Sequence, residues 1–248
     1  LGLGGIYVID MNSYTTSNFI DVTDVTTLNI DLGQAMLPAG GNGVGGRELM
    51  AVKTQANHDA TVFPLIGKIG IGDLDISEDG NKLFFVNLHD KSLYSIDITA
   101  YNSSGSKPTV ADKTATPIPD PKCKFGESRP FGTKVYRGKV YVGTICDGSM
   151  PSSVMTLDNQ RSNLKASIFV YDTLAMSFDP IPVLTFPLTY PKGYPASVLT
   201  KYTGWYAWTD VFNDLLPLSP PAACPDCFSY PTPILADIEF DTDGTMVI

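Results

Sequence analysis

Four carboxylates alternate along the sequence near residue 240, at Asp237, Glu239, Asp241 and Asp243. Ca²⁺ prefers ligand oxygens from several Asp and Glu side chains on a loop, so this run is a candidate calcium site. Alternate residues of a β-strand share one face, however, and Asp243 is followed by Gly244 in a dipeptide typical of hairpin turns. The run therefore also predicts the solvent-facing side of a strand, and the sequence leaves both interpretations open.

Other residues are candidates for ligand binding by position or type. Asp73, Arg129 and Asp237 stand at or just before the start of similar segments. If those segments are the innermost strands of sheets around an axis, the three side chains would meet at a channel mouth. The alternative is hydrogen bonding between neighbouring sheets. Trp205 and Trp208, in the stretch YTGWYAWTDVF, predict either an aromatic platform for a ligand or core packing.

The four cysteines are Cys123, Cys146, Cys224 and Cys227. The last two have redox-motif spacing, but a Pro-rich loop surrounds them, and a four-cysteine zinc site would need a second close pair. Structural disulfides are favoured over zinc or redox chemistry, and three pairings are open. We expect Cys123–Cys146, which flank the first two strands of one unit, with Cys224–Cys227 closing a loop. The even count favours an extracellular or cell-surface location.

No catalytic residues are predicted. The two histidines, His58 and His89, lie in polar, turn-like contexts. Neither is accompanied by a nucleophile-elbow sequence for which it could act as the base. Residues 41–46 formally match a dinucleotide-binding glycine pattern, but a loop sequence precedes them where a strand is required. We therefore interpret this segment as a loop.

The composition indicates an all-β protein with many turns. The 248 residues are 43% hydrophobic and only 17% charged, with 22 glycines and 19 prolines. A net charge of −9 argues against a nucleic-acid partner, because binding to phosphates needs a basic surface. No apolar run approaches the ~20 residues of a membrane-spanning helix, so no membrane insertion is expected.

A repeat provides the elements that would position these residues. Each copy contains a strand, a turn ending in glycine and a second strand, and the copies cover Asp73–Val86, Phe131–Gly143 and Asp237–Ile248. The Asp-Gly turns predict type I′ hairpins. A third strand recurs as an aliphatic, an aromatic, a spacer, an apolar residue and Asp, at Ile6–Asp10, Leu93–Asp97 and Ile168–Asp172.

Such a repeat predicts a β-propeller whose blades have four antiparallel strands. The expected blade pieces cover residues 1–30, 62–105, 128–190 and 234–248 of a single domain, 1–248. Residues 101–122 and 174–233 are expected to be long loop insertions. The chain begins at a third strand and ends at a second, which gives about three blades where a propeller needs at least ~4. We therefore expect a partial propeller that continues beyond the C-terminus.

Several stretches carry a family resemblance: IGKIGIGDLDISEDGNKLFFVNLHDKSLYSIDI, RPFGTKVYRGKVYVGTIC, the Trp205–Trp208 pair and YPTPILADIEFDTDGTMVI. Together they resemble the propeller region of large secreted bacterial surface proteins that carry repeat modules similar to the B domains of serine-aspartate-repeat adhesins. The resemblance covers most of residues 62–248. It implies a multi-domain, cell-surface chain, and it offers no catalytic residues to carry over.

The favoured functional hypothesis is an extracellular, non-catalytic propeller that acts in binding, adhesion or surface assembly. Its partners would be other protein chains or surface glycans, and exposed edge strands would also permit homo-assembly. The alternative is a calcium-dependent propeller hydrolase or lactonase with its metal at the channel mouth. Calcium is the one cofactor that the sequence suggests.

Overall fold

The computed structural model describes residues 3–33, 62–149, 161–191, 204–211 and 231–248. The strands are β1 (Gly5–Asp10), β2 (Thr15–Asp21), β3 (Ile71–Ile76), β4 (Lys82–Asn87), β5 (Ser92–Asp97), β6 (Lys113–Pro117), β7 (Ser128–Tyr136), β8 (Lys139–Cys146), β9 (Lys165–Asp172), β10 (Ser177–Phe178), β11 (Leu184–Pro187), β12 (Glu239–Phe240) and β13 (Met246–Val247). The helices are one short α-helix, α1 (Thr99–Ser104), and 3-10 turns at Phe63–Leu65 and Val110–Asp112. Within the described residues, no helix is long and apolar enough to cross a membrane.

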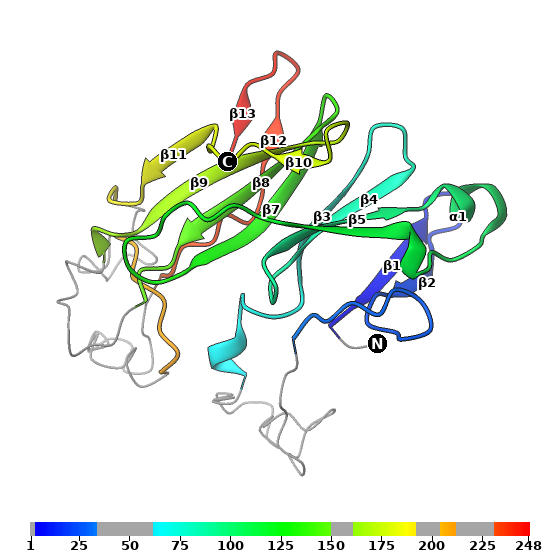
Figure 1. Cartoon of the computed structure of the whole chain (residues 1–248), viewed down its shortest axis with the longest axis horizontal. Coiled ribbons are helices and arrows are strands. Elements are labelled where there is room, and N and C mark those ends of the chain that lie inside the picture. Colours follow the sequence, from blue (N-terminus) through cyan, green and yellow to red (C-terminus); the bar gives the residue numbers. More distant parts are fainter. Residues whose placement is uncertain (1–2, 34–61, 150–160, 192–203, 212–230) are drawn as a thin grey trace, which may run out of the picture.

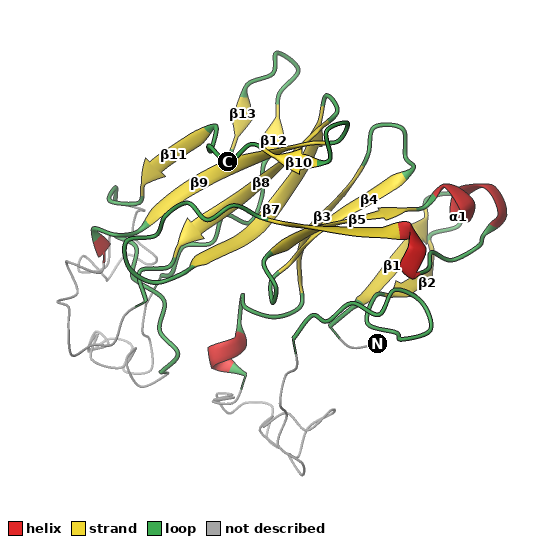
Figure 2. Ribbon diagram, in the orientation of Figure 1, coloured by secondary structure: helices red, strands yellow, loops and turns green. Residues whose placement is uncertain are grey.

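The strands form two full sheets and two hairpins (Figures 1 and 2). The first full sheet has the order β3-β4-β5-β6, and the second has the order β7-β8-β9-β10, with β11 also pairing with β9. The hairpin β1–β2 comes before them in the chain, and the hairpin β12–β13 follows them. All pairings are antiparallel, so the all-β prediction is confirmed. The described sheets form an open row and do not close into a ring.

Three apolar clusters hold the row together, one between each pair of neighbours. The first joins β1–β2 to the first full sheet through Phe19, Ile20, Leu83, Phe85 and Ile96, among others. The second joins the two full sheets through Phe84, Val86, Val140, Val142 and Tyr171. The third joins the second sheet to the C-terminal segment through Ile145, Ile168, Leu235 and Ile238. Successive side chains of a strand face opposite sides, so each full sheet contributes to two clusters.

The two full sheets also share a bulge in their first strands. The register of β3 shifts between Ile71 and Leu74, and the register of β7 shifts between Pro130 and Thr133. A bulge places one extra residue in a strand and bends it. Near the β7 bulge, the amide of Gly132 donates to the carbonyl of Leu235 at 2.9 Å, which brings the C-terminal segment against the strand.

The type I′ turns that were expected at the two Asp-Gly sites are not formed, whereas the third turn of the repeat has that geometry. Arg137-Gly138 is a two-residue turn with positive φ at both residues, 51° and 71°, as type I′ requires. Asp79-Gly80 and Asp243-Gly244 instead lie in five-residue turns, 77–81 and 241–245, in which only the glycine has positive φ. Each of these aspartates accepts the amide two residues later, and this local bond favours the longer turn.

Parts of the expected loop insertions are ordered strands, so those two predictions were wrong in extent. β6 lies within 101–122, and β10 and β11 lie within 174–233. β6 is partly exposed along its length and ends at Pro117, as suits the outer edge of a sheet. Its sequence therefore lacks the apolar alternation that revealed the inner strands.

Candidate functional site

Arg129 is held in an ion pair on the inner side of β7. Its Nε donates to Oδ2 of Asp147 at 2.8 Å, and the Asp147 side chain has no exposed surface. Oδ1 of Asp147 also accepts the amides of Glu127 and Ser149, each at 2.9 Å. A buried carboxylate needs a charge partner and hydrogen-bond donors to remain ionised. The pair therefore fixes the β7–β8 end of the sheet, and Arg129 points to Asp147 and not to Asp73 or Asp237.

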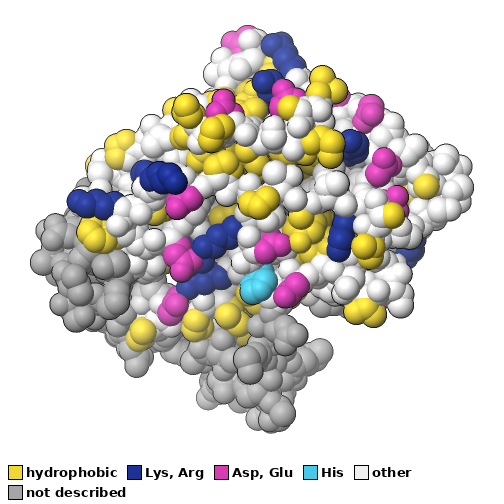
Figure 3. Space-filling view, in the orientation of Figure 1, with side chains coloured by type: hydrophobic (Ala, Val, Ile, Leu, Met, Phe, Trp, Pro, Cys, Tyr) yellow, Lys and Arg dark blue, Asp and Glu magenta, His cyan; other side chains and the backbone are white. Residues whose placement is uncertain are grey.

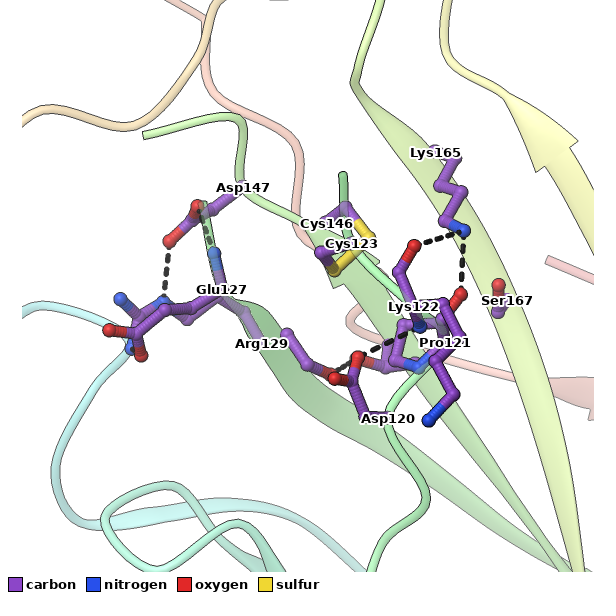
Figure 4. Close-up of a disulfide and its surroundings, with 12 residues drawn as sticks. Asp120, Pro121, Lys122, Cys123, Glu127, Arg129, Cys146, Asp147, Lys165 and Ser167 are labelled. Atoms are coloured by element: carbon purple, nitrogen blue, oxygen red, sulfur yellow. Dashed lines mark hydrogen bonds and ion pairs between the residues drawn. A yellow bond between two sulfur atoms is a disulfide. The ribbon is translucent and has the colours of Figure 1, made fainter. Parts of the chain in front are cut away.

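The Cys123–Cys146 disulfide lies next to this ion pair, and its prediction is confirmed (Figure 4). It ties the loop before β7 to the last residue of β8. On the other side of the loop, Nζ of Lys165 donates to the carbonyl oxygens of Pro121 and Lys122 at 2.6 and 3.1 Å. The loop is thus fixed to both β8 and β9. The predicted partners Cys224 and Cys227 lie outside the described residues.

Asp73 belongs to a ladder of carboxylates that joins the two full sheets. Oδ2 of Asp73 accepts the amide of Thr133 at 2.9 Å, and Oδ2 of Asp75 accepts the amide of Val135 at 2.8 Å. The β3–β4 turn adds a third bond, from the amide of Arg137 to Oε1 of Glu78, at 2.6 Å. The acceptors lie along β3 and the turn after it, and the donors are alternate amides along β7 and the turn after it. This is the inter-sheet hydrogen bonding that the sequence offered as the alternative to a ligand site.

Asp73 uses both oxygens within this ladder, since Oδ1 accepts the amide of Leu74 at 2.8 Å. Burial raises the pKa of Asp73, the two amide bonds oppose that shift, and the nearby Asp237 carboxylate adds to it. The Asp73 and Asp237 carboxylates are therefore close enough to interact electrostatically. The third predicted member, Arg129, is engaged elsewhere.

The four alternating carboxylates of the C-terminal hairpin are exposed and have separate roles. Glu239 accepts Nζ of Lys134 at 2.9 Å, which raises the pKa of that lysine. Asp241 and Asp243 accept backbone amides of their own turn, from Thr242 and Thr245. In the part of the chain that the structure describes, no three His, Cys, Asp or Glu side chains form a group that could hold a metal ion. The calcium site stays a prediction.

The two tryptophans lie in the third apolar cluster. Trp208 is buried, and its Nε1 donates to the carbonyl of Pro233 at 2.9 Å. The Arg129 guanidinium lies 5.7 Å from its ring, so Trp208 shields the Arg129–Asp147 pair. Trp205 is partly buried, and it is the one of the pair that borders an open hollow.

That hollow, of about 420 Å³, lies between the second full sheet and the C-terminal segment. Its lining is mainly apolar and includes Ile145, Ala166, Phe186, Leu188, Trp205, Leu235, Asp237 and Ile248. Figure 3 shows hydrophobic side chains gathered in the upper part of the view, where Figure 1 places β9, β11 and β13. The predicted ligand residues Trp205 and Asp237 thus share one hollow.

Sequence reasoning missed one feature that matters here. This is Asp147, whose burial has no signal in the sequence beside its position after a strand.

The comparisons with known proteins found no relative. No protein-family model matches the chain, and no curated protein matches it.

Proposed function

We propose that this chain is a non-catalytic, extracellular module of the β-propeller type that acts in binding, adhesion or surface assembly. Its sheets have four strands in sequence order, with the first strand of each next to the first strand of its neighbour. The carboxylate ladder links β3 to β7, and the Gly132–Leu235 bond links β7 to the segment before β12. In propellers the first strands likewise lie side by side around the axis.

The apolar hollow beside Trp205 is the observation that carries the proposal. Its volume is about 420 Å³, its lining is mainly apolar and includes the aromatic rings of Phe186 and Trp205, and Asp237 adds a carboxylate. An apolar and aromatic surface with few polar groups binds a partner by burying apolar area, and the polar group orients the partner.

Binding agrees with the site chemistry better than calcium-dependent hydrolysis does. A catalytic calcium would need free carboxylate oxygens at the inner strand ends. Both carboxylate oxygens of Asp73 instead accept hydrogen bonds from backbone amides, and Arg129 is paired with Asp147. These bonds give the inner strand ends a structural role.

The extracellular location is supported by the Cys123–Cys146 disulfide, because such bonds persist in oxidising compartments. The resemblance to propeller regions of bacterial surface proteins points the same way. Adhesion or assembly at a cell surface is the role that joins these two indications to the apolar hollow.

Selection of peptides tests the proposal. Peptides chosen from a random display library on the parent chain should lose roughly tenfold or more in affinity on Trp205→Ala or Asp237→Ala, because each variant removes a side chain that lines the hollow. Val25→Ala is the matched control, since Val25 is 76% exposed and does not line the hollow. Binding that ignores the two hollow variants would overturn the proposal. So would turnover of esters or lactones that requires calcium and is lost in Asp237→Ala.

A further inference from the structure

Three lysines gather around a second hollow, at one end of the second full sheet. Lys122 and Lys124 come from the loop before β7, and Lys165 opens β9. This lysine hollow has a volume of about 280 Å³, and no described Asp or Glu lines it. The chain as a whole has a net charge of −9, so the hollow is a local exception in charge. We propose that it binds a saccharide that carries a carboxylate or sulfate group.

The positive charges around the hollow are not neutralised by the protein. Among the described residues, none of the three lysines forms an ion pair. Asp120, on the same loop, accepts the backbone amide of Lys122 at 2.9 Å and pairs with no lysine. Nζ of Lys124 lies 5.4 Å from the centre of the Phe125 ring, which attracts a cation without neutralising it. An anion in the hollow would therefore meet uncompensated charge.

Lys165 is the lysine whose ammonium is fixed in place. It is partly buried, and its Nζ donates to the carbonyl oxygens of Pro121 and Lys122 at 2.6 and 3.1 Å (Figure 4). An ammonium has three N–H donors, so one remains for a ligand. Both carbonyl acceptors are neutral, and a partly buried charge without a counter-ion is costly. A bound carboxylate or sulfate would supply that counter-ion.

The loop that carries the other two lysines is held in one conformation. Lys122 has a φ of 62°, in the left-handed region that glycine adopts at lower cost. The Asp120 bond, the Cys123–Cys146 disulfide and the Lys165 bonds all act on this part of the loop. A lysine at this position adds a charge that glycine would not provide. Because the loop is ordered before binding, a ligand loses less free energy in ordering it.

The rest of the lining favours a saccharide over a simple anion. Ser162, Asn163 and Thr185 add hydroxyl and amide groups, and Leu164 and Pro187 add apolar surface. Sugar rings combine hydroxyl groups with apolar C–H faces, whereas inorganic sulfate would leave the apolar walls unused. The volume is near the lower end of the ~300–1,000 Å³ range of small-ligand pockets, which suits about one or two sugar rings.

The overall charge argues against larger polyanions. A nucleic acid or an anionic membrane would extend beyond the hollow and meet the negative charge of the rest of the chain. A short acidic saccharide places its charge among the three lysines and leaves the remaining surface free. The observations therefore favour an acidic glycan as the ligand.

The lysine hollow is distinct from the apolar hollow beside Trp205. Thr185 pairs with Ser167 across β11 and β9, and Phe186 pairs with Ala166. Successive side chains of a strand face opposite sides, so Lys165 and Thr185 face away from the side of Ala166 and Phe186. The inference thus goes beyond the proposed function and adds a second site with a different ligand class.

Calorimetric titration of the full chain tests the inference. The probes are a heparin-derived tetrasaccharide, which carries sulfates, an oligogalacturonate tetrasaccharide, which carries carboxylates, and neutral maltotetraose. At about 50 mM salt, at least one acidic probe should bind while the neutral probe does not, and about 0.5 M salt should weaken the binding by screening. Binding of one acidic probe alone would identify the acidic group.

A pair of double variants with equal charge change locates the site. Lys122→Gln with Lys124→Gln should weaken binding of the acidic probe roughly tenfold or more, because two charge contacts are lost. Lys107→Gln with Lys139→Gln is the matched control, since both lysines are exposed and neither lines the hollow. All four replaced side chains are exposed, so the fold should be unaffected.

Four results would overturn the inference. They are the absence of binding by both acidic probes, an equal loss in the two double variants, inorganic sulfate binding as tightly as the tetrasaccharides, and preferential binding to anionic phospholipid vesicles. The peptides that test the apolar hollow provide a separate measurement. If they still require Trp205, the proposed function stands even where the acidic saccharides fail to bind.

Discussion

The aspartate that ends each third strand is a structural residue of the turn that follows. Asp10, Asp97 and Asp172 each accept the amide two residues later, at 2.7, 2.9 and 2.9 Å. Hydrogen bonds to the ionised carboxylate are the main cause that lowers the pKa of each of these groups. The repeat in the sequence thus reports turn chemistry and not a catalytic or metal-binding function.

This lowering predicts a loss of stability in acid. A carboxylate whose folded pKa lies below its unfolded value stabilises the fold above the unfolded pKa, and that contribution disappears as the pH falls through the folded value. Asp172→Asn should therefore lower the urea midpoint at pH 7, and the difference from the parent should shrink below about pH 4. Urea titrations from pH 2 to 7 would measure it.

A high-salt series separates the turn bonds from the ion pair. Lys139 lies 4.0 Å from Asp172 and both are exposed, so about 1 M salt should screen that attraction and leave the amide bonds intact. A parent–variant difference that vanishes in salt at pH 7, or that stays constant down to pH 2, would contradict the role given to the turn.

The sequence indicated which charged residues lie near the inner strands, but it did not indicate their hydrogen-bond and ion-pair partners. Asp73 and Asp237 were recognised from equivalent places in the repeat, although Asp73 lies within β3 and Asp237 lies just before β12. Arg129 was assigned to the same mouth, yet the buried carboxylate of Asp147, at the end of the neighbouring strand β8, binds it instead. Burial depends on which loop folds over a strand end, and no local pattern encodes that.

At the scale of elements, glycine controls how closely neighbouring inner strands approach. A Cβ on Gly132 would lie 2.8 Å from the carbonyl oxygen of Leu235 and 3.0 Å from the amide nitrogen of Asp237. Both contacts are with backbone, which has no flexible side chain to move aside. The absence of a side chain at this bulge lets the C-terminal segment seat against β7.

Gly132→Ala should therefore destabilise the protein by ~1–3 kcal/mol, as overpacking against rigid neighbours does. Gly204→Ala is the matched control, because nothing lies within 4 Å of a Cβ there. It should be neutral or slightly stabilising, since alanine restricts the unfolded chain. Urea denaturation of both variants measures the difference. Equal stability would show that the segment before β12 does not depend on this close approach.

The inner elements were predictable because their signals are local. Alternating apolar residues and glycine turns located strands β3, β4, β7 and β8, and the recurring third-strand pattern located β1, β5 and β9. The outer strands β6, β10 and β11 were not found, because edge strands pack on one side and need little apolar alternation. Turn type was also missed at Asp79-Gly80, where one side-chain hydrogen bond selects the longer turn.

At the scale of the whole molecule, the fold is a row of sheets with a separate core at each contact. No apolar cluster spans more than two neighbouring pieces. Proteins built from nearest-neighbour contacts open piece by piece, because the loss of one interface leaves the others intact. The carboxylate ladder between β3 and β7 strengthens the central contact beyond its apolar burial.

Two core truncations at opposite ends of the row should therefore have local effects. Phe19→Ala removes a ring buried between β1–β2 and the first sheet, and Ile238→Ala removes a side chain buried against the second sheet. Each costs about 2–5 kcal/mol at its own contact.

Hydrogen-exchange mass spectrometry would measure these effects. Phe19→Ala should raise the exchange rates of the amides in β1 and β2, while the amides of β8 and β9 stay protected. Ile238→Ala should raise the exchange rates of the amides in β12 and β13 and leave the rates in β1 and β2 unchanged. If both variants instead raise exchange evenly across all four pieces, the row unfolds as one unit, and the three cores do not act separately.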